Sequence, residues 1–223
     1  MTAHTALHSL PLFPLGSVLF PQGLLSLRVF EVRYLDMIGR CHKAGAPFGI
    51  VCLSEGSEVR RLDPAALPSG DGFAKEVFHP VGTLAHIESL ERPQPGLMVI
   101  RCRGLQRFDI QRRLQLPHGL WVADVQLHAP EPVVPVPEHL AQTSEGLQRL
   151  LRSLQERDPA SLDQLPLQPP YHWDDSGWVA NRWAELLPAP AELKQRLMTL
   201  DNPLLRLELV SDLLDKLGLD GGA

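Results

Sequence analysis

The stretch LPLFPLGSVLFPQGLLSLRVFEVRYLDMI, residues 10–38, decides the fold because it is strongly apolar and yet unsuited to a helix over its first half. A membrane-spanning helix needs about 20 apolar residues whose backbone hydrogen bonds close inside the segment. Prolines and glycines interrupt this pattern at Pro11, Pro14, Gly16, Pro21 and Gly23. The stretch therefore predicts short extended strands with a turn at its Pro-Gln-Gly, rather than a membrane span.

The overall composition is that of an ordinary globular protein with a mildly acidic balance of charge. The 223 residues carry a formal net charge of −5, which gives no general attraction to nucleic acid or to acidic lipid. Cys41, Cys52 and Cys102 are an odd number of cysteines in apolar contexts, which favours reduced thiols over a disulfide framework. The start of the chain lacks the basic residues of a signal peptide. We therefore expect a soluble cytoplasmic protein with no membrane partner.

Residues 1–128 predict a β-rich domain, because short apolar or alternating runs are separated by turn residues. The clearest of these runs are 48–53, 81–90, 97–110 and 120–128. Their close spacing favours a barrel or a rolled sheet, and Gly104 inside the third run predicts a bulge or a sharp bend. One helix is expected from about Glu31 to His42, with an apolar face made of Phe30, Tyr34, Met37, Ile38 and Cys41. The polar segment 54–72 is expected to be a long loop.

A proline-rich stretch, residues 129–138, marks the predicted boundary between two domains because such a segment is stiff and extended. Residues 139–223 then follow helical periodicity. The last helix has the clearest limits, with Asn202 as N-cap, Pro203 at the first helical position and Gly218 as the stop. The expected fold class is α+β, with an N-terminal β-rich pseudo-barrel followed by a C-terminal helical bundle.

The sequence carries no recognisable catalytic signature. It has no phosphate-binding loop of the Walker type, no nucleophile elbow and no paired-histidine zinc motif. His79 and His86 lack the tight ligand spacing of a closed zinc site, so we interpret them as surface or hydrogen-bonded histidines. No catalytic residue, metal site or cofactor is therefore assigned, and a stand-alone peptidase is disfavoured because no nucleophile can be named.

Arg101, Arg103 and Arg107 form a local basic cluster on one predicted strand, with Arg112 and Arg113 beyond them. Arginines on a sheet can bind phosphates or RNA, in which case affinity falls steeply with salt. The alternative is that they form the ordinary solvent-facing side of a strand. The acidic net charge favours this second interpretation, and Phe108 is the one aromatic residue beside them that could stack on a base.

Several motifs together, in this order, resemble the N-terminal domain of Lon protease, also called the Lon substrate-binding domain. The opening stretch carries three of them, at 10–15 (LPLFPL), 19–23 (LFPQG) and 30–34 (FEVRY). The others are FGIV (48–51), VGTLAHI (81–87), GLQRFDI (104–110), and the WAELLP and final leucine-rich helix of the C-terminal part. The resemblance covers about residues 8–217. The chain is similar to this domain alone, without the ATPase and Ser-Lys peptidase modules of the protease, so proteolysis is not implied.

The resemblance implies a PUA-like barrel followed by helices, and a non-catalytic module that binds unfolded or apolar polypeptide or acts as an adaptor. Unfolded or extended polypeptides are the partners expected on this basis, together with a protease or chaperone. An apolar strand interrupted by proline leaves backbone groups open at a sheet edge, where an extended peptide can add. The candidate binding residues are Phe13, Leu15 and Phe20. The alternative function is RNA binding by the PUA-like barrel through Arg101, Arg103 and Arg107.

Overall fold

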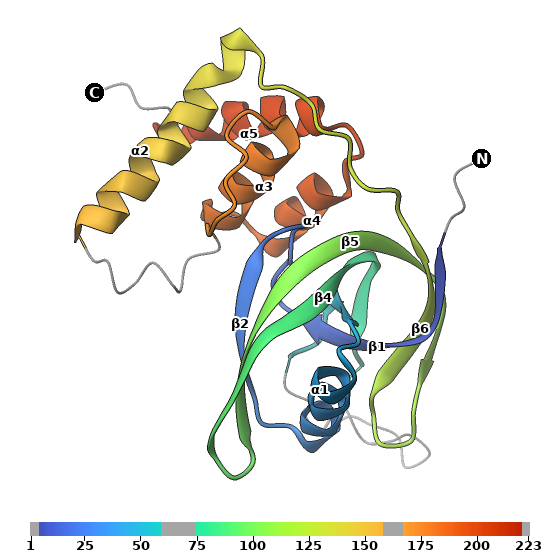
Figure 1. The fold of residues 1–223 in the computed structure, drawn as a ribbon. Coiled ribbons are helices and arrows are strands. Elements are labelled where there is room, and N and C mark those ends of the chain that lie inside the picture. The colour runs from blue at the N-terminus through green and yellow to red at the C-terminus, as the bar shows by residue number, and fades with distance from the viewer. Residues whose placement is uncertain (1–4, 59–74, 158–166, 220–223) are drawn as a thin grey trace. The chain divides into compact units, whose positions relative to one another are not determined.

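The structure is a computed structural model that describes residues 5–58, 75–157 and 167–219. Most of the predicted polar loop, from residue 59 to residue 72, lies outside the described residues. The chain divides into two compact units (Figure 1). The first comprises Met1–Pro21 with Leu25–Ala129, and the second comprises Gln22–Leu24 with Pro130–Ala223.

The first unit is a six-stranded sheet that closes on itself. Its elements are β1 (Ala6–Leu15), β2 (Leu24–Val29), α1 (Val32–Ala44), β3 (Phe48–Glu55), β4 (Val77–Gln94), β5 (Leu97–Gln115) and β6 (Trp121–Leu127). The strand order is β2-β5-β4-β3-β1-β6, and β5 also pairs with β6. Five strands therefore form a closed ring, while β2 is attached to β5 outside it (Figure 1). This confirms the predicted barrel within an α+β fold.

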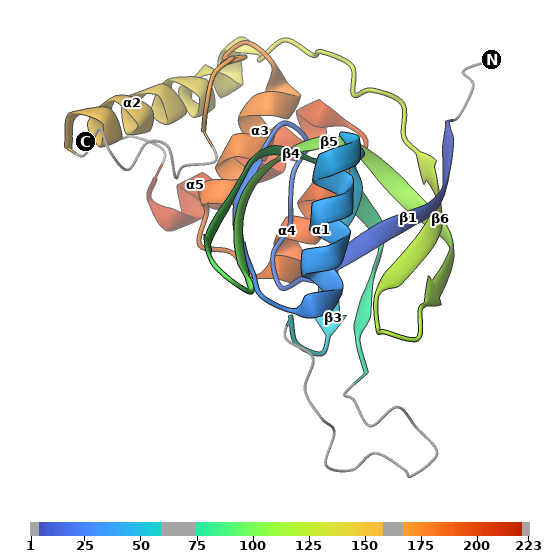
Figure 2. The ribbon, with the colours of Figure 1, turned by 60° about the horizontal axis from the view of Figure 1, so that its bottom comes forward.

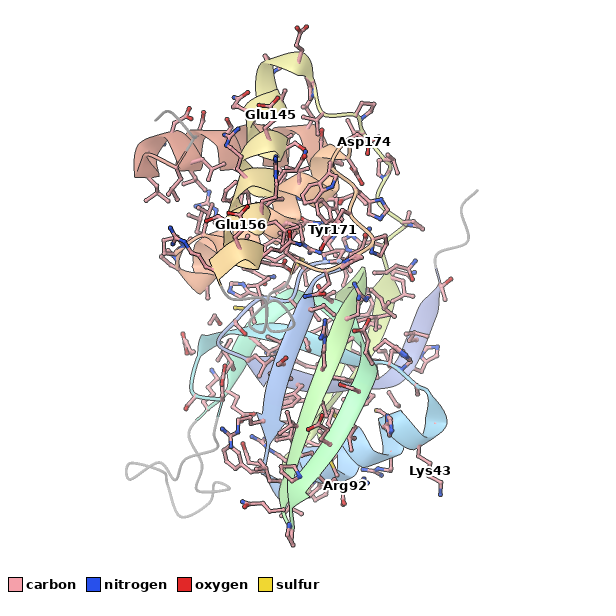
Figure 3. The ribbon with its side chains drawn as sticks, turned by 60° about the vertical axis from the view of Figure 1, so that its left-hand side comes forward. Lys43, Arg92, Glu145, Glu156, Tyr171 and Asp174 are labelled. Atoms are coloured by element: carbon pink, nitrogen blue, oxygen red, sulfur yellow. The ribbon has the colours of Figure 1, made fainter. Side chains whose placement is uncertain are left out.

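Two long strands supply much of the barrel wall. β4 and β5 form an antiparallel hairpin with Arg92 near its tip (Figure 3). The pairing register shifts between the pairs Ala85–Gly104 and Thr83–Arg107, which confirms the irregularity predicted at Gly104. A side chain at Gly104 would meet the backbone, since its Cβ would lie 2.2 Å from the carbonyl oxygen of Phe20. The bulge thus brings β5 against the chain that follows β1.

Helix α1 covers part of the barrel with one apolar face (Figure 2). Tyr34, Met37, Ile38 and Cys41 lie on this face and are buried in the same core cluster as Phe13. Their helical spacing was predicted correctly, and the helix ends at Gly45 in the left-handed conformation. The prediction was wrong for the fifth residue of the face, Phe30. It precedes the N-cap residue Glu31, lies outside the helix and is 54 % exposed.

A buried arginine joins α1 to two other parts of the barrel. The Arg33 guanidinium donates to the Glu76 carboxylate at 2.9 Å, to the Gly119 carbonyl at 2.7 Å and to Glu31 at 3.1 Å. The Trp121 indole donates to the other oxygen of Glu76 at 2.7 Å. Burial alone lowers the pKa of Arg33, but the hydrogen bond to Glu76 and nearby charges outweigh this effect and raise the pKa. Arg33 therefore stays charged and paired with both carboxylates.

The described part of the second unit contains a short 3-10 helix η1 (Glu138–Leu140) and four α-helices, α2 (Ala141–Arg157), α3 (Ser176–Leu186), α4 (Ala191–Thr199) and α5 (Pro203–Leu217). The predicted limits of the last helix are confirmed, because the Asn202 side chain accepts from the first turn of α5 and Gly218 ends it in the left-handed conformation. None of the described helices is both long and apolar enough to cross a membrane.

The proline-rich stretch packs within the second unit. Glu131 makes a bidentate ion pair with the buried Arg206 of α5. Farther along, the backbone N–H of Val136 donates to Asp174, and that of Ser176 donates to Val134. These hydrogen bonds satisfy backbone polar groups of the proline-rich stretch. Its prolines lack the N–H donors that a regular β-sheet ladder needs.

We expect Gly104→Ala to destabilise the barrel, because the new methyl group would collide with the Phe20 carbonyl rather than with a movable side chain. Overpacking of this kind costs about 1–3 kcal/mol. The matched control is Gly39→Ala in α1, whose Cβ would meet only Met98 at 3.9 Å. It should stabilise the protein by about 0.5–1 kcal/mol through helix propensity. Urea unfolding monitored by circular dichroism measures both changes, and equal effects at the two positions would contradict this account.

We expect Arg33→Ala to lower the free energy of unfolding by about 3 kcal/mol or more, because it leaves the Glu76 carboxylate buried without its cation. Arg40→Ala on the same helix is the control, since Arg40 is exposed and its side chain bonds only the preceding turn of α1. Tryptophan fluorescence during denaturation measures the loss of stability. Trp121 is one of the fluorescent probes, because its indole donates to Glu76. Superimposable unfolding curves for the two variants would rule out a structural role for Arg33.

Candidate functional site

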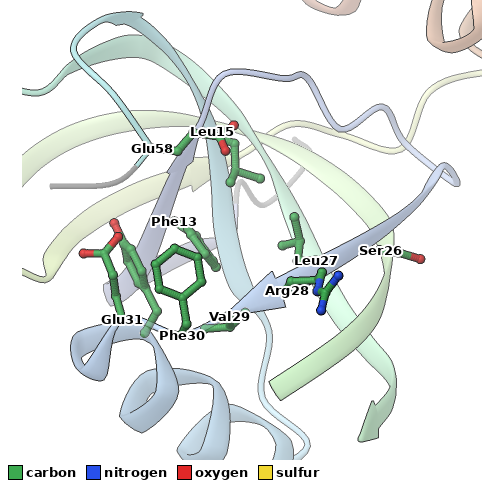
Figure 4. Close-up of a pocket in the computed structure, with 10 residues that line it drawn as sticks. Phe13, Leu15, Ser26, Leu27, Arg28, Val29, Phe30, Glu31 and Glu58 are labelled. Atoms are coloured by element: carbon green, nitrogen blue, oxygen red, sulfur yellow. The ribbon is translucent and has the colours of Figure 1, made fainter. Parts of the chain in front are cut away.

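The first unit carries a pocket of about 270 Å³ between the end of β1 and the strand β2 (Figure 4). Its lining comes from β1, β2, the start of α1 and the chain after β3. The lining residues are Phe13, Leu15, Ser26, Leu27, Arg28, Val29, Phe30, Glu31, Tyr34 and Glu58. Pockets that take small molecules usually measure roughly 300–1,000 Å³. This pocket lies near the lower end of that range and has room for one or two side chains.

The pocket exists because the sheet has an opening at this point. β1 pairs with β6 only as far as Leu12, although its last residues continue to pair with β3 on the other side. β2 pairs with β5 alone among the described strands. The end of β1 and the outer edge of β2 therefore face the pocket without a strand between them.

The floor of the pocket is apolar and closely packed. Phe13 and Tyr34 stack with their ring centroids 4.0 Å apart, and Leu15 and Val29 lie beside them as buried residues. Phe30 stands at the pocket with about half of its surface exposed. The exposed Phe30 ring and the buried floor together give the pocket an apolar surface at its mouth and at its base.

Three charged side chains surround the apolar floor. Figure 4 shows Glu31 and Glu58 on one side of the pocket and Arg28 on the other. One oxygen of Glu58 accepts from the backbone N–H of Gly16 at 2.6 Å, and one oxygen of Glu31 accepts from Arg33 at 3.1 Å. These bonds hold both carboxylates in place.

The structure divides the three predicted binding residues. Phe13 and Leu15 line the pocket, although each is more than nine-tenths buried. Phe20 is 0 % exposed and lies outside the lining, so the structure does not bring it to this pocket. The segment of Phe20 is drawn into the barrel because the Thr83 hydroxyl donates to the Leu19 carbonyl at 2.6 Å and Gly104 packs on the Phe20 backbone.

Sequence reasoning missed Phe30 on the open side of the pocket and Tyr34 in its floor. Phe30 and Tyr34 were both assigned to the apolar face of the helix. One signal was available, because Leu25, Leu27 and Val29 alternate with the polar Ser26 and Arg28. That alternation is typical of a half-solvated strand, and such a strand can lie at an edge.

The arginines of the alternative RNA site are already paired or buried. Arg101 and Arg103 both approach Glu88, with the Nε of Arg103 at 2.5 Å from its carboxylate. Arg107 is 6 % exposed and lies within the barrel wall. Arg113 lies over the rings of Phe78 and Trp121. Arg101 and Arg103 therefore share one carboxylate, and Arg107 presents little surface to a phosphate backbone. In the described ranges, no group of three or more metal-ligating side chains is arranged to hold an ion.

Comparison with known proteins agrees with this fold. The family model of the ATP-dependent protease La (LON) substrate-binding domain matches residues 9–216. The crystal structure of a Lon N-terminal domain protein from Xanthomonas campestris is 30 % identical, with a TM-score of 0.68, and the match covers 92 % of this chain and 98 % of that chain. The N-terminal domain of a Mycobacterium avium complex Lon protease shares the fold at 18 % identity and a TM-score of 0.52, with 92 % and 96 % of the two chains covered. No curated protein matches the sequence. The chain belongs to the family of Lon substrate-binding domains.

Proposed function

We propose that this protein is a non-catalytic module that binds unfolded polypeptides by their apolar side chains, and that the pocket between β1 and β2 is the binding site. The observation that carries the proposal is the pairing of a buried apolar floor, Phe13 and Leu15, with the half-exposed Phe30 above the barrel opening. Membership of a substrate-binding family supports a polypeptide as the ligand.

The size and chemistry of the pocket fit weak binding of many different apolar polypeptide segments. Burial of one large apolar side chain is worth about 1.5–3 kcal/mol, which gives selectivity for apolar over polar segments but little preference among apolar sequences. The floor offers carbon surface rather than a pattern of hydrogen-bond donors. A module that must accept many unfolded chains needs this tolerance.

The pocket lining does not supply the parts of a hydrolytic site. Ser26 is its one serine, and the lining contains no histidine, cysteine or lysine that could take a proton from the hydroxyl. Glu31 and Glu58 are already held by other groups. Binding without chemistry is therefore the role that these residues support.

We expect Phe30→Ala to weaken binding of an unfolded polypeptide by about 5–30-fold, as for an interface residue worth about 1–2 kcal/mol. The folded protein should keep its stability, because Phe30 is half exposed and lies outside the core clusters. Fluorescence anisotropy with a labelled, reduced and carboxymethylated model protein measures the affinity. Thermal unfolding of the same samples checks the fold.

Leu114→Ala is the matched control, because Leu114 is similarly exposed but lies on β5 outside the pocket. It should leave the affinity unchanged. Equal losses for both variants would show that binding follows general surface hydrophobicity and would overturn the assignment of the site. No binding of the unfolded protein by the natural chain would overturn the proposed function itself.

A further inference from the structure

We propose that the bound polypeptide joins the sheet as an added strand along the outer edge of β2, with one apolar side chain in the pocket and a lysine or arginine beside Glu31 and Glu58. This inference rests on the proposed function and names its ligand class, which is an extended segment with a large apolar residue and a basic residue two positions away. Three features of the pocket support it.

The first feature is the free edge of β2. This strand has one partner among the described strands, β5, so the backbone groups on its other side face the barrel opening. Across the pocket, β6 pairs with β1 only as far as Leu12. On that side the last residues of β1 therefore have no partner among the described strands. Unpaired N–H and C=O groups on a strand edge are a template for another strand. An extended polypeptide satisfies them through its own backbone, whatever its sequence.

The second feature is the position of the apolar floor beside that edge. Side chains of an added strand point alternately to opposite faces of the sheet, so every second ligand side chain faces Phe13 and Leu15. Phe30 lies at the end of β2 and covers the same spot from outside. The backbone therefore supplies attachment, while the pocket selects one apolar side chain.

The third feature is the charge beside the floor. Glu31 and Glu58 each have one oxygen in a hydrogen bond, and the second oxygen of each has no partner among the described residues. Both stand on the same side of the pocket (Figure 4). Because side chains at positions i and i+2 of a strand share a face, a basic residue two positions from the apolar one reaches these carboxylates. Charge complementarity thus assigns a basic residue to this flank of the ligand.

The test uses a labelled peptide of about seven residues, mostly threonine, with a central phenylalanine and a lysine two positions away. Single N-methyl groups are placed along its backbone in turn. N-methylation at alternate residues should weaken binding by about tenfold, because it removes a hydrogen bond and leaves a β2 carbonyl unpaired, whereas the intervening positions should tolerate it. A loss that does not alternate along the peptide would overturn strand addition.

The charge partner is tested by replacing the peptide lysine with glutamate, which should weaken binding by the natural protein by about 2–5-fold. Glu58→Gln should remove most of this discrimination while its amide oxygen still accepts from Gly16. Glu91→Gln, an exposed residue of the β4–β5 hairpin, is the matched control and should leave the discrimination intact. Unchanged discrimination in the Glu58 variant would overturn the assigned basic flank.

The experiments distinguish failure of strand addition from failure of polypeptide binding itself. If the labelled unfolded protein binds but the peptide shows neither alternation nor charge discrimination, the pocket binds polypeptide and the strand-addition model is wrong. If neither the unfolded protein nor the peptide binds, the proposed function is wrong. Alternation together with a Glu58-dependent preference for lysine supports both.

Discussion

The buried guanidinium of Arg33 is the interaction on which the first unit depends. Its three acceptors come from different parts of the chain: Glu31 just before α1, Glu76 just before β4, and the Gly119 carbonyl in the β5–β6 turn. A charge taken out of water must be paired in good geometry, so these groups have essentially one arrangement in which they can be buried together. That arrangement fixes the start of α1 against the barrel. It thereby places Tyr34 beneath the pocket and Glu31 at its edge.

The opening between β1 and β2 lies beside the closed ring, where β6 no longer pairs with the end of β1. Five strands complete the ring, and β2 stays outside it with β5 as its one partner among the described strands. Natural proteins usually protect such edges with short strands and charged side chains, because an open edge recruits other strands. β2 follows this pattern, since it is six residues long and presents the charged Arg28 to solvent. The edge beside the apolar pocket is therefore both short and charged.

The parts of the fold that were predictable have local causes. Gly45 and Gly218 end α1 and α5 in the left-handed conformation that glycine adopts without strain, and Asn202 caps α5 with its own side chain. The irregularity at Gly104 was also visible, because a glycine inside a strand marks a bulge or a close approach of backbone. The exposure of individual apolar residues has a different cause. Phe20 and Phe30 both belong to the apolar opening stretch of the sequence, yet one is fully buried and the other is half exposed.

The sequence by itself determined the β-rich first half, the helical second half, the ends of individual helices and membership of the family, because these depend on short-range periodicity, capping and ordered motifs. The tertiary structure decided where the candidate site lies. Among the described strands β1 pairs with β3 and β6 and β2 pairs with β5 alone, which leaves the opening in which Phe13 forms a floor and Phe30 stays exposed. Strand pairing joins residues that are far apart in the chain, and the energy that selects one register comes from the whole packed core rather than from any local stretch.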